Sequence, residues 1–206
     1  MNQNNKRLII ACGALAREIQ QVIQLNGWTS IDVQCLPASL HNRPEKIPPL
    51  VGGKIEAQAP HYSEIFVAYA DCGTGGLLDR VLEQKGVQRL DGAHCYEFYA
   101  GSSVFDRLQD AEPGTFYLTD FLARHFDRLV IKDLGLDRHP SLRDTYFGNY
   151  SRLLYLSQKS SPELVEKARQ AADRLQLPFE QLSTGYGQLA VQIGRFADSP
   201  RSGGLG

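Results

Sequence analysis

Short apolar runs alternate with longer amphipathic segments along most of this chain. The runs have the length and composition of strands: Leu8–Ala11, Ile31–Leu36, Ile65–Tyr69, Val87–Leu90, Thr115–Leu118, Leu153–Leu156 and Phe179–Leu182. The segments between them have helical spacing, and the clearest begins with Ser161 as N-cap followed by a proline. This alternation predicts an α/β protein with a mostly parallel, doubly wound (Rossmann-like) sheet and helices on both faces.

The length favours a single domain. A chain of 206 residues, 42% hydrophobic and 22% charged, can bury one core. We therefore predict one α/β domain over residues 1–197. Residues 198–206, which are rich in glycine and serine, are predicted as a flexible C-terminal tail.

Charge and hydropathy argue against several classes of partner. A net charge of -1 gives no reason to expect a nucleic-acid-binding face. No apolar run approaches the roughly 18 residues of a membrane span, and the polar segment Met1–Arg7 lacks the apolar region of a signal peptide. A cytoplasmic location is expected, where cysteines are more often free, ligating or catalytic than paired in disulfides.

Three cysteines follow predicted strands. Cys12, Cys72 and Cys95 each come where a strand gives way to a turn or helix. Since the carboxyl ends of parallel strands share one edge of a sheet, the three thiols are predicted to meet there. Three thiolates with one imidazole or water would hold a tetrahedral zinc ion, and His94 and His41 are the candidate imidazoles. Three thiolates could instead hold an iron–sulfur cluster with one open iron.

Two other readings of these cysteines remain open. No cysteine lies in a CxxC pair, so the pattern is weaker than that of a zinc ribbon. One thiol could act as a nucleophile without metal, or all three could simply fill tight space at strand ends. The fourth cysteine, Cys35, lies inside its strand and is predicted to be a core residue.

The loop after the third strand predicts an anion-binding turn. Gly73, Thr74 and Gly75 precede a helix whose first backbone N–H groups would attract a phosphate or other cofactor anion. The same helix start should lower the pKa of Cys72 and favour its thiolate. Tight-turn geometry explains the glycines equally well.

Four further residues complete the candidate site. Glu97 is a possible general base, or a residue that orients a ligand histidine, although an acid in the first turn of a helix also suits the helix dipole. His41, in the loop after the second strand, is an acid–base or ligand candidate. Gly185 and Tyr186 follow the last strand and are predicted to close over a bound ligand.

Several motifs together resemble the domain-of-unknown-function family 1638. They span roughly residues 7 to 193 and include Ala11–Leu15, Leu40–Lys46, Asp71–Asp79, His94–Glu97, Pro113–Asp120, Leu134–Pro140, Tyr146–Tyr150 and Gly185–Gly187. Members of this family are often encountered beside corrinoid-dependent methyltransferases. The resemblance therefore implies an association with methyl-group metabolism, and names no reaction or catalytic residue.

These observations lead to one functional hypothesis and one rival. The hypothesis is a metal-binding protein, holding zinc or an iron–sulfur cluster, that acts in corrinoid-linked one-carbon metabolism. It would be an enzyme such as a metal-thiolate methyltransferase, or a redox protein. The rival is a non-catalytic partner that docks on a methyltransferase or on its corrinoid protein, so that any corrinoid is reached through that partner.

Overall fold

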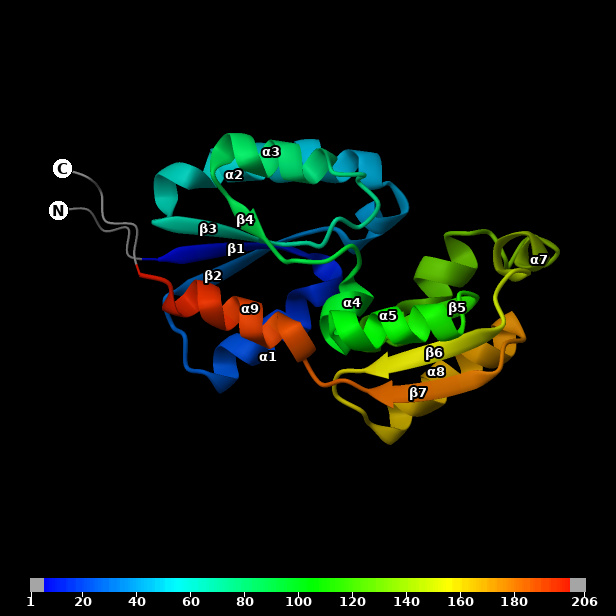
Figure 1. The fold of residues 1–206 in the computed structure, drawn as a ribbon. Helices are drawn as coiled ribbons and strands as arrows, with labels where there is room; N and C mark the ends of the chain where they lie inside the picture. The colour runs from blue at the N-terminus through cyan, green and yellow to red at the C-terminus, as the bar shows by residue number, and fades with distance from the viewer. Residues whose placement is uncertain (1–5, 201–206) are drawn as a thin grey trace, which may run out of the picture. The chain divides into compact units, whose positions relative to one another are not determined.

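The computed structural model describes residues 6–200, which divide into two compact units. Unit 1 runs to Phe98 and resumes at Gln188, and unit 2 runs from Tyr99 to Gly187. Each unit has its own parallel sheet, so the seven strands form two sheets where the sequence predicted one (Figure 1). Whether the two units unfold together, as a single domain would, stays a prediction.

Unit 1 is built on four parallel strands. These are β1 (Arg7–Cys12), β2 (Ile31–Leu36), β3 (Glu64–Ala68) and β4 (Gln88–Arg89). Their order is β2-β1-β3-β4, so the chain leaves β1 on one side to form β2 and then crosses back to form β3 on the other. The strand order therefore reverses between β1 and β3, and open α/β sheets bind ligands at the carboxyl edge of such a switch point.

Helices cover both faces of this sheet. In Figure 1, α2 (Ile47–Gln58) and α3 (Leu77–Lys85) lie on one face, and α1 (Ala16–Leu25) and α9 (Gly187–Asp198) lie on the other. The central strand β1 is buried along its whole length, as expected for a parallel strand with helices on both sides. The short 3-10 helices are η1 (Gly13–Leu15), η2 (Ala38–Asn42), η3 (Pro44–Lys46) and η4 (Ala59–His61).

The end of α9 is fixed to the start of β1. The buried guanidinium of Arg7 donates hydrogen bonds to the carbonyl oxygens of Phe196, Ala197 and Ser199, and pairs with Glu64 at 3.0 Å. A cation suits the unpaired carbonyls at a helix C-terminus. Asp198 ends α9, and the Ser199 carbonyl is one of the groups that Arg7 holds. Residues 201–206 lie outside the described part of the chain, so the flexible tail expected over residues 198–206 stays a prediction.

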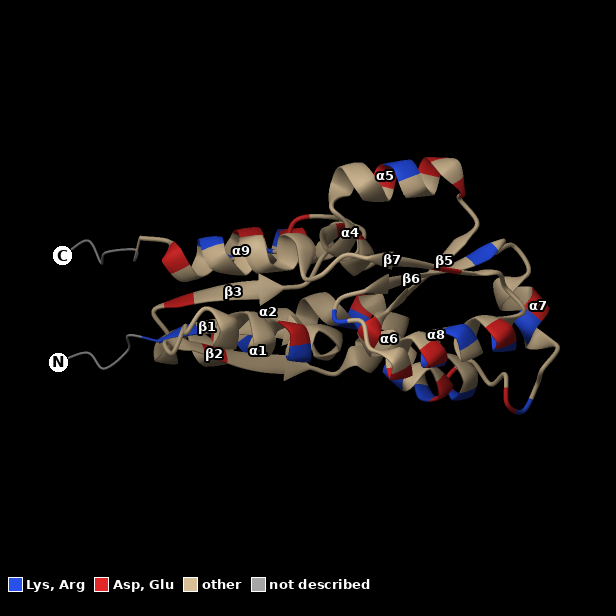
Figure 2. Ribbon diagram, turned by 90° about the horizontal axis from the view of Figure 1, so that it is seen from below, with Lys and Arg blue, Asp and Glu red and all other residues tan. Residues whose placement is uncertain are grey.

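Unit 2 is a three-stranded parallel sheet with helices on both sides. Its strands β5 (Thr115–Thr119), β6 (Arg152–Ser157) and β7 (Phe179–Ser183) are paired in chain order. Figure 2 shows α5 (Ser102–Ala111) on one side of the strands, and α6 (Asp120–Phe126) and α8 (Pro162–Leu175) on the other. The remaining elements are α4 (Cys95–Ala100), which spans the division between the units, the π-helical turn Asp127–Lys132 and α7 (Leu142–Phe147).

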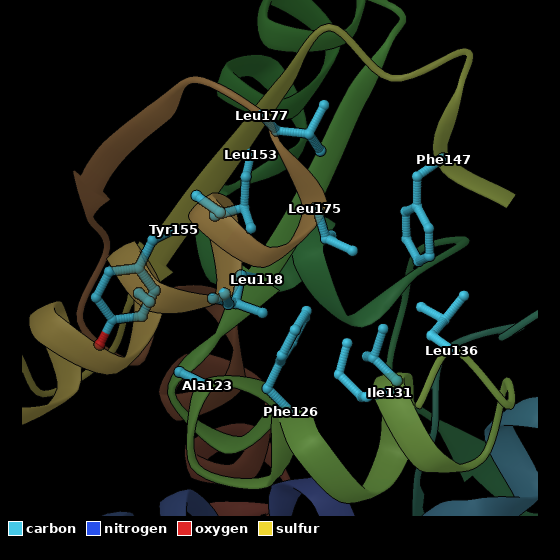
Figure 3. Close-up of a cluster of buried hydrophobic side chains, with 14 of the residues drawn as sticks. Leu118, Ala123, Phe126, Ile131, Leu136, Phe147, Leu153, Tyr155, Leu175 and Leu177 are labelled. Atoms are coloured by element: carbon cyan, nitrogen blue, oxygen red, sulfur yellow. The ribbon is translucent and has the colours of Figure 1, made fainter. Parts of the chain in front are cut away.

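The core of unit 2 lies between its sheet and the helices α6 and α8. Figure 3 shows Leu118 of β5 and Leu153 of β6 facing Phe126 of α6 and Leu175 of α8. Phe147 closes the cluster from α7. Each strand thus contributes a row of apolar side chains to one helical layer, which is why these strands appear in the sequence as continuous apolar runs.

The α/β class and the parallel strands are confirmed. All seven predicted strands form within a residue or two of their expected bounds. The predicted N-cap Ser161 is confirmed, because its side chain accepts a hydrogen bond from the Leu164 amide. Thr119 caps α6 in the same way, by accepting a hydrogen bond from the Leu122 amide. Among residues 6–200, none of the helices combines the length and hydropathy needed to cross a membrane.

Candidate functional site

The carboxyl edge of the unit 1 sheet gathers the three predicted cysteines. Cys12 is the last residue of β1, and Cys72 follows β3, the strand beside it. Cys95 is the first residue of α4. The loop before α4 is joined to the loop after β3 by a 2.9 Å hydrogen bond from the Cys72 amide to the Ala93 carbonyl. The two chain segments are thus held side by side at the switch point.

The three thiols lie within electrostatic reach of one another. Burial raises the pKa of Cys12, raises that of Cys72 to about 12, and raises that of Cys95 well above its usual value. Charge on Cys12 or Cys72 would raise the pKa of Cys95 further, and charge on Cys12 would do the same for Cys72. Burial thus favours the protonated form of all three thiols. Among residues 6–200 no three His, Cys, Asp or Glu side chains are placed to share a metal ion, so a shared site for the three cysteines stays a prediction.

The pKa of Cys72 contradicts one expectation from the sequence. A helix start was expected to lower this pKa, but α3 begins only at Leu77, and Cys72 is almost fully buried. Loss of hydration destabilises a thiolate more than the distant helix start stabilises it. The prediction that Cys72 is an activated thiol is wrong for the metal-free protein.

Cys72 also has an unusual backbone conformation. Its φ of 51° lies in the left-handed region, which only one other non-glycine residue in the described chain adopts, Gln176. Such a conformation costs a residue with a Cβ about 1–2 kcal/mol. The two amides of the Asp71–Cys72 segment hold it by bonding to the carbonyls of Gly92 and Ala93. Strained residues of this kind are concentrated at functional sites.

The predicted anion cradle is filled by a side chain of the protein itself. The Asp71 carboxylate accepts hydrogen bonds from the Thr74 hydroxyl at 2.7 Å, the Gly76 amide at 2.9 Å and the Gly75 amide at 3.2 Å. Burial acts to raise the pKa of Asp71, but these hydrogen bonds outweigh it and the pKa is lowered. Cofactor binding by Gly73, Thr74 and Gly75 stays a prediction, and an external anion would have to displace Asp71.

Both candidate histidines lie at the same edge. His41, in η2, and His94, before α4, are exposed, and they are close enough for His94 to affect the ionisation of His41. The protein around the His41 ring, followed by the charge of His94, lowers the pKa of His41. The lowered pKa favours the neutral, metal-binding form of the His41 imidazole.

Glu97 has a structural contact in the loop before α4. Its Oε2 accepts a 2.8 Å hydrogen bond from the Ala93 amide, and a Cβ at Gly92 would come within 3.0 Å of the same oxygen. Glu97 therefore orders the segment that leads to Cys95. Its predicted catalytic role stays a prediction.

Two predicted residues belong to the other unit. Gly185 and Tyr186 follow β7 in unit 2, where the Gly185 carbonyl accepts a 3.0 Å hydrogen bond from the Thr184 hydroxyl. Gly185 has a φ of 59°, which fits a tight turn. A role for this pair in covering a ligand stays a prediction.

Cys35 is exposed, although the sequence predicted a core residue. It lies on β2, which is the edge strand of the sheet and pairs with β1 alone. An edge strand is covered less completely than a central one, and along β2 only Ile31 is buried. Cys35 is therefore a suitable control for the three clustered thiols.

Sequence reasoning missed Tyr69, which lies between β3 and Cys72. The residue is 2% exposed, and its hydroxyl makes no hydrogen bond of ordinary geometry with the described residues. Burial raises its pKa, and the neighbouring Cys12 and Cys72 thiols raise it further. In the sequence, Tyr69 looks like one more apolar residue of a buried strand.

A cavity of about 500 Å³ lies elsewhere in unit 1. It runs beside β4 and is lined by residues of α3 and α9, with Phe66 and Phe196 stacked at 5.2 Å. None of the predicted site residues lines it. Two of its charged groups are paired with each other, since Arg89 donates to both carboxylate oxygens of Asp79.

One comparison with known proteins assigns the chain to a family. The family is described as protein of unknown function (DUF1638), and its model matches residues 35–191. The chain belongs to this family. The DUF1638 match includes Cys72, Cys95, His41 and His94, and it begins after Cys12. No curated protein matches the chain.

Proposed function

We propose that this DUF1638 protein binds a thiophilic metal through Cys12, Cys72 and Cys95. Zinc is the first candidate, and an iron–sulfur cluster is the alternative. The proposal is supported by the position of the three cysteines, which lie on separate chain segments at the carboxyl edge of the unit 1 sheet, near enough for a charge on one thiol to affect another. Soft thiolate sulfur favours zinc and iron–sulfur clusters over hard cations such as magnesium.

Protonated thiols favour a metal ligand over a free nucleophile. A nucleophilic cysteine needs a lowered pKa, and burial raises the pKa of all three of these thiols. A bound metal reverses this effect, because its charge stabilises the thiolates and the thiol protons leave to solvent. The same environment that suppresses a lone thiolate is therefore compatible with a metal–thiolate group.

The side chains must move to form such a site. Within residues 6–200, no three His, Cys, Asp or Glu side chains are arranged as ready metal ligands. Binding would require the thiols to turn toward one point. His94, adjacent to Cys95, is the nearest imidazole in sequence for a fourth ligand, and His41 is the second choice.

The proposed biological setting is methyl-group metabolism linked to corrinoid proteins. A zinc site would stabilise the thiolate form of a thiol that accepts a methyl group. An iron–sulfur cluster would instead deliver electrons, for example to keep a corrinoid reduced. In both cases a methyltransferase or its corrinoid protein is the proposed partner.

Metal analysis tests the first part of the proposal. Protein purified without oxygen should contain stoichiometric zinc or iron, measured by elemental analysis. Cys12→Ser, Cys72→Ser and Cys95→Ser should each lose the metal, and the exposed Cys35→Ser should retain it. A wild-type protein that neither contains metal nor takes up added zinc would refute metal binding.

Growth on methylated one-carbon substrates tests the biological setting. The three site variants should fail to support such growth, whereas Cys35→Ser should support it. Normal growth from all three variants, together with intact binding to a methyltransferase, would favour a non-catalytic assembly role instead.

A further inference from the structure

The hydroxyl of Tyr69 is a buried donor for which the metal-free protein provides no ordinary acceptor. Tyr69 is 2% exposed, and within residues 6–200 its oxygen has no hydrogen-bond partner. Buried polar groups in native proteins are almost always paired, and an unpaired one calls for an explanation such as a missing ligand or ion.

The sheet register places this hydroxyl beside one of the three thiols. β1 and β3 run parallel with Ala11 opposite Ala68, so Cys12 and Tyr69 are the next residues of two adjacent segments. The Tyr69 hydroxyl and the Cys12 thiol influence each other's ionisation, through a looser contact than an ordinary hydrogen bond. The register therefore places the Tyr69 and Cys12 side chains next to each other on the same face of the sheet.

The state of the sulfur decides whether that contact is a strong hydrogen bond. A neutral thiol is a weak acceptor, whereas a thiolate is charged and accepts strongly. When a divalent metal binds, the Cys12 sulfur keeps its electron pair and forms the metal bond, and its proton leaves to solvent. No electron is transferred, so the step balances without any further reactant.

We propose that Tyr69 is a positioning residue whose hydroxyl donates a hydrogen bond to the Cys12 thiolate of the metal-bound protein. The inference rests on the proposed metal site. A buried hydroxyl without a hydrogen-bond partner, next to a proposed ligand cysteine, fits this role. Groups that hydrogen-bond to metal ligands orient them and strengthen binding.

Tyr155 provides a matched control in unit 2. It is also fully buried on a strand of a parallel sheet, but its hydroxyl donates a 2.7 Å hydrogen bond to Asp120. Tyr69→Phe and Tyr155→Phe therefore remove the same atom from two buried tyrosines, one without an ordinary partner and one with a good partner.

The test measures zinc affinity and metal-free thermal stability for the wild type and both variants. Tyr69→Phe should weaken zinc binding about 10- to 100-fold, while the metal-free melting temperature does not fall. Tyr155→Phe should lower that melting temperature and leave zinc affinity unchanged.

The possible failures are distinguishable. If the wild type binds no zinc, the proposed function and this inference fall together. If the wild type binds zinc and Tyr69→Phe binds it equally well, the inference is wrong and the metal site stands. If Tyr69→Phe lowers the melting temperature without metal as much as Tyr155→Phe does, the inference is also wrong, because the Tyr69 hydroxyl would then have a hydrogen-bond partner without metal.

Discussion

The two units of this protein carry polar groups at the carboxyl edges of their sheets, but they treat those groups differently. In unit 2, the fully buried Asp120 carboxylate accepts hydrogen bonds from Tyr155, Gln158 and Lys159, at 2.7 to 3.1 Å. In unit 1, the Tyr69 hydroxyl lacks an ordinary partner and three neighbouring thiols are held protonated by burial.

This difference separates a structural edge from a candidate functional one. Asp120 joins the end of β5 to the loop after β6, and these hydrogen bonds replace the water that its carboxylate loses on burial. The unit 1 edge leaves a buried donor and a strained backbone at Cys72 unexplained by the fold alone. Unsatisfied and strained groups are the ones that call for a ligand or a reaction.

Removing Asp120 should have the largest effect on folding. Asp120→Ala leaves the Tyr155 hydroxyl and the amides of Gln158 and Lys159 without their acceptor, so a loss of about 3 kcal/mol in the free energy of unfolding is expected. Urea unfolding measures it. Asp144→Ala, at an exposed carboxylate, is the control and should change stability by less than about 0.5 kcal/mol.

Zinc binding by the wild type should strengthen steeply as pH rises. The pKa values of the three thiols are raised by burial, so each must lose a proton to bind metal at neutral pH. Affinity should rise ~10-fold per pH unit for every proton displaced. Competition with a metal-binding dye between about pH 6 and pH 8 measures the slope. A flat profile would mean that the thiols are not the ligands.

The metal-free protein should lose stability in alkali. The folded-state pKa of Cys72 is about 12, above the unfolded thiol value of about 8.5. As pH rises, the unfolded chain therefore releases the Cys72 proton before the folded protein does. The contribution of Cys72 to folding stability is complete below about pH 8.5 and declines between about pH 8.5 and pH 12. Urea unfolding should show a smaller difference in the free energy of unfolding between the wild type and Cys72→Ser at about pH 10 than at about pH 7. A constant difference would contradict the shift.

The two left-handed residues give the smallest effect and a direct comparison of the units. Gln176, with φ of 56°, ends α8 in unit 2, and glycine prefers this position. Gln176→Gly should stabilise the protein by about 0.5–1 kcal/mol without changing zinc affinity. Cys72→Gly should exceed the stability of Cys72→Ala by about 1 kcal/mol, and both should lose zinc. Equal stability of the two Cys72 variants would show that the turn is not strained.

Local patterns in the sequence determined the elements of this protein. The apolar runs identified the strands because a parallel strand between two helical layers buries both of its faces. Ser161 was recognisable as a cap because an N-cap acts on an amide only three residues away. The prediction that Cys12, Cys72 and Cys95 follow strands came from the same patterns.

Only the tertiary structure decided which strands pair and what each side chain meets. The strand pattern is the same whether seven strands form one sheet or two, since pairing depends on distant segments. The exposure of Cys35 follows from its edge strand, and the raised pKa of Cys72 follows from burial by chain segments far apart in sequence. The unpartnered hydroxyl of Tyr69 is likewise invisible in the sequence, because hydrogen bonding and desolvation depend on neighbours in space.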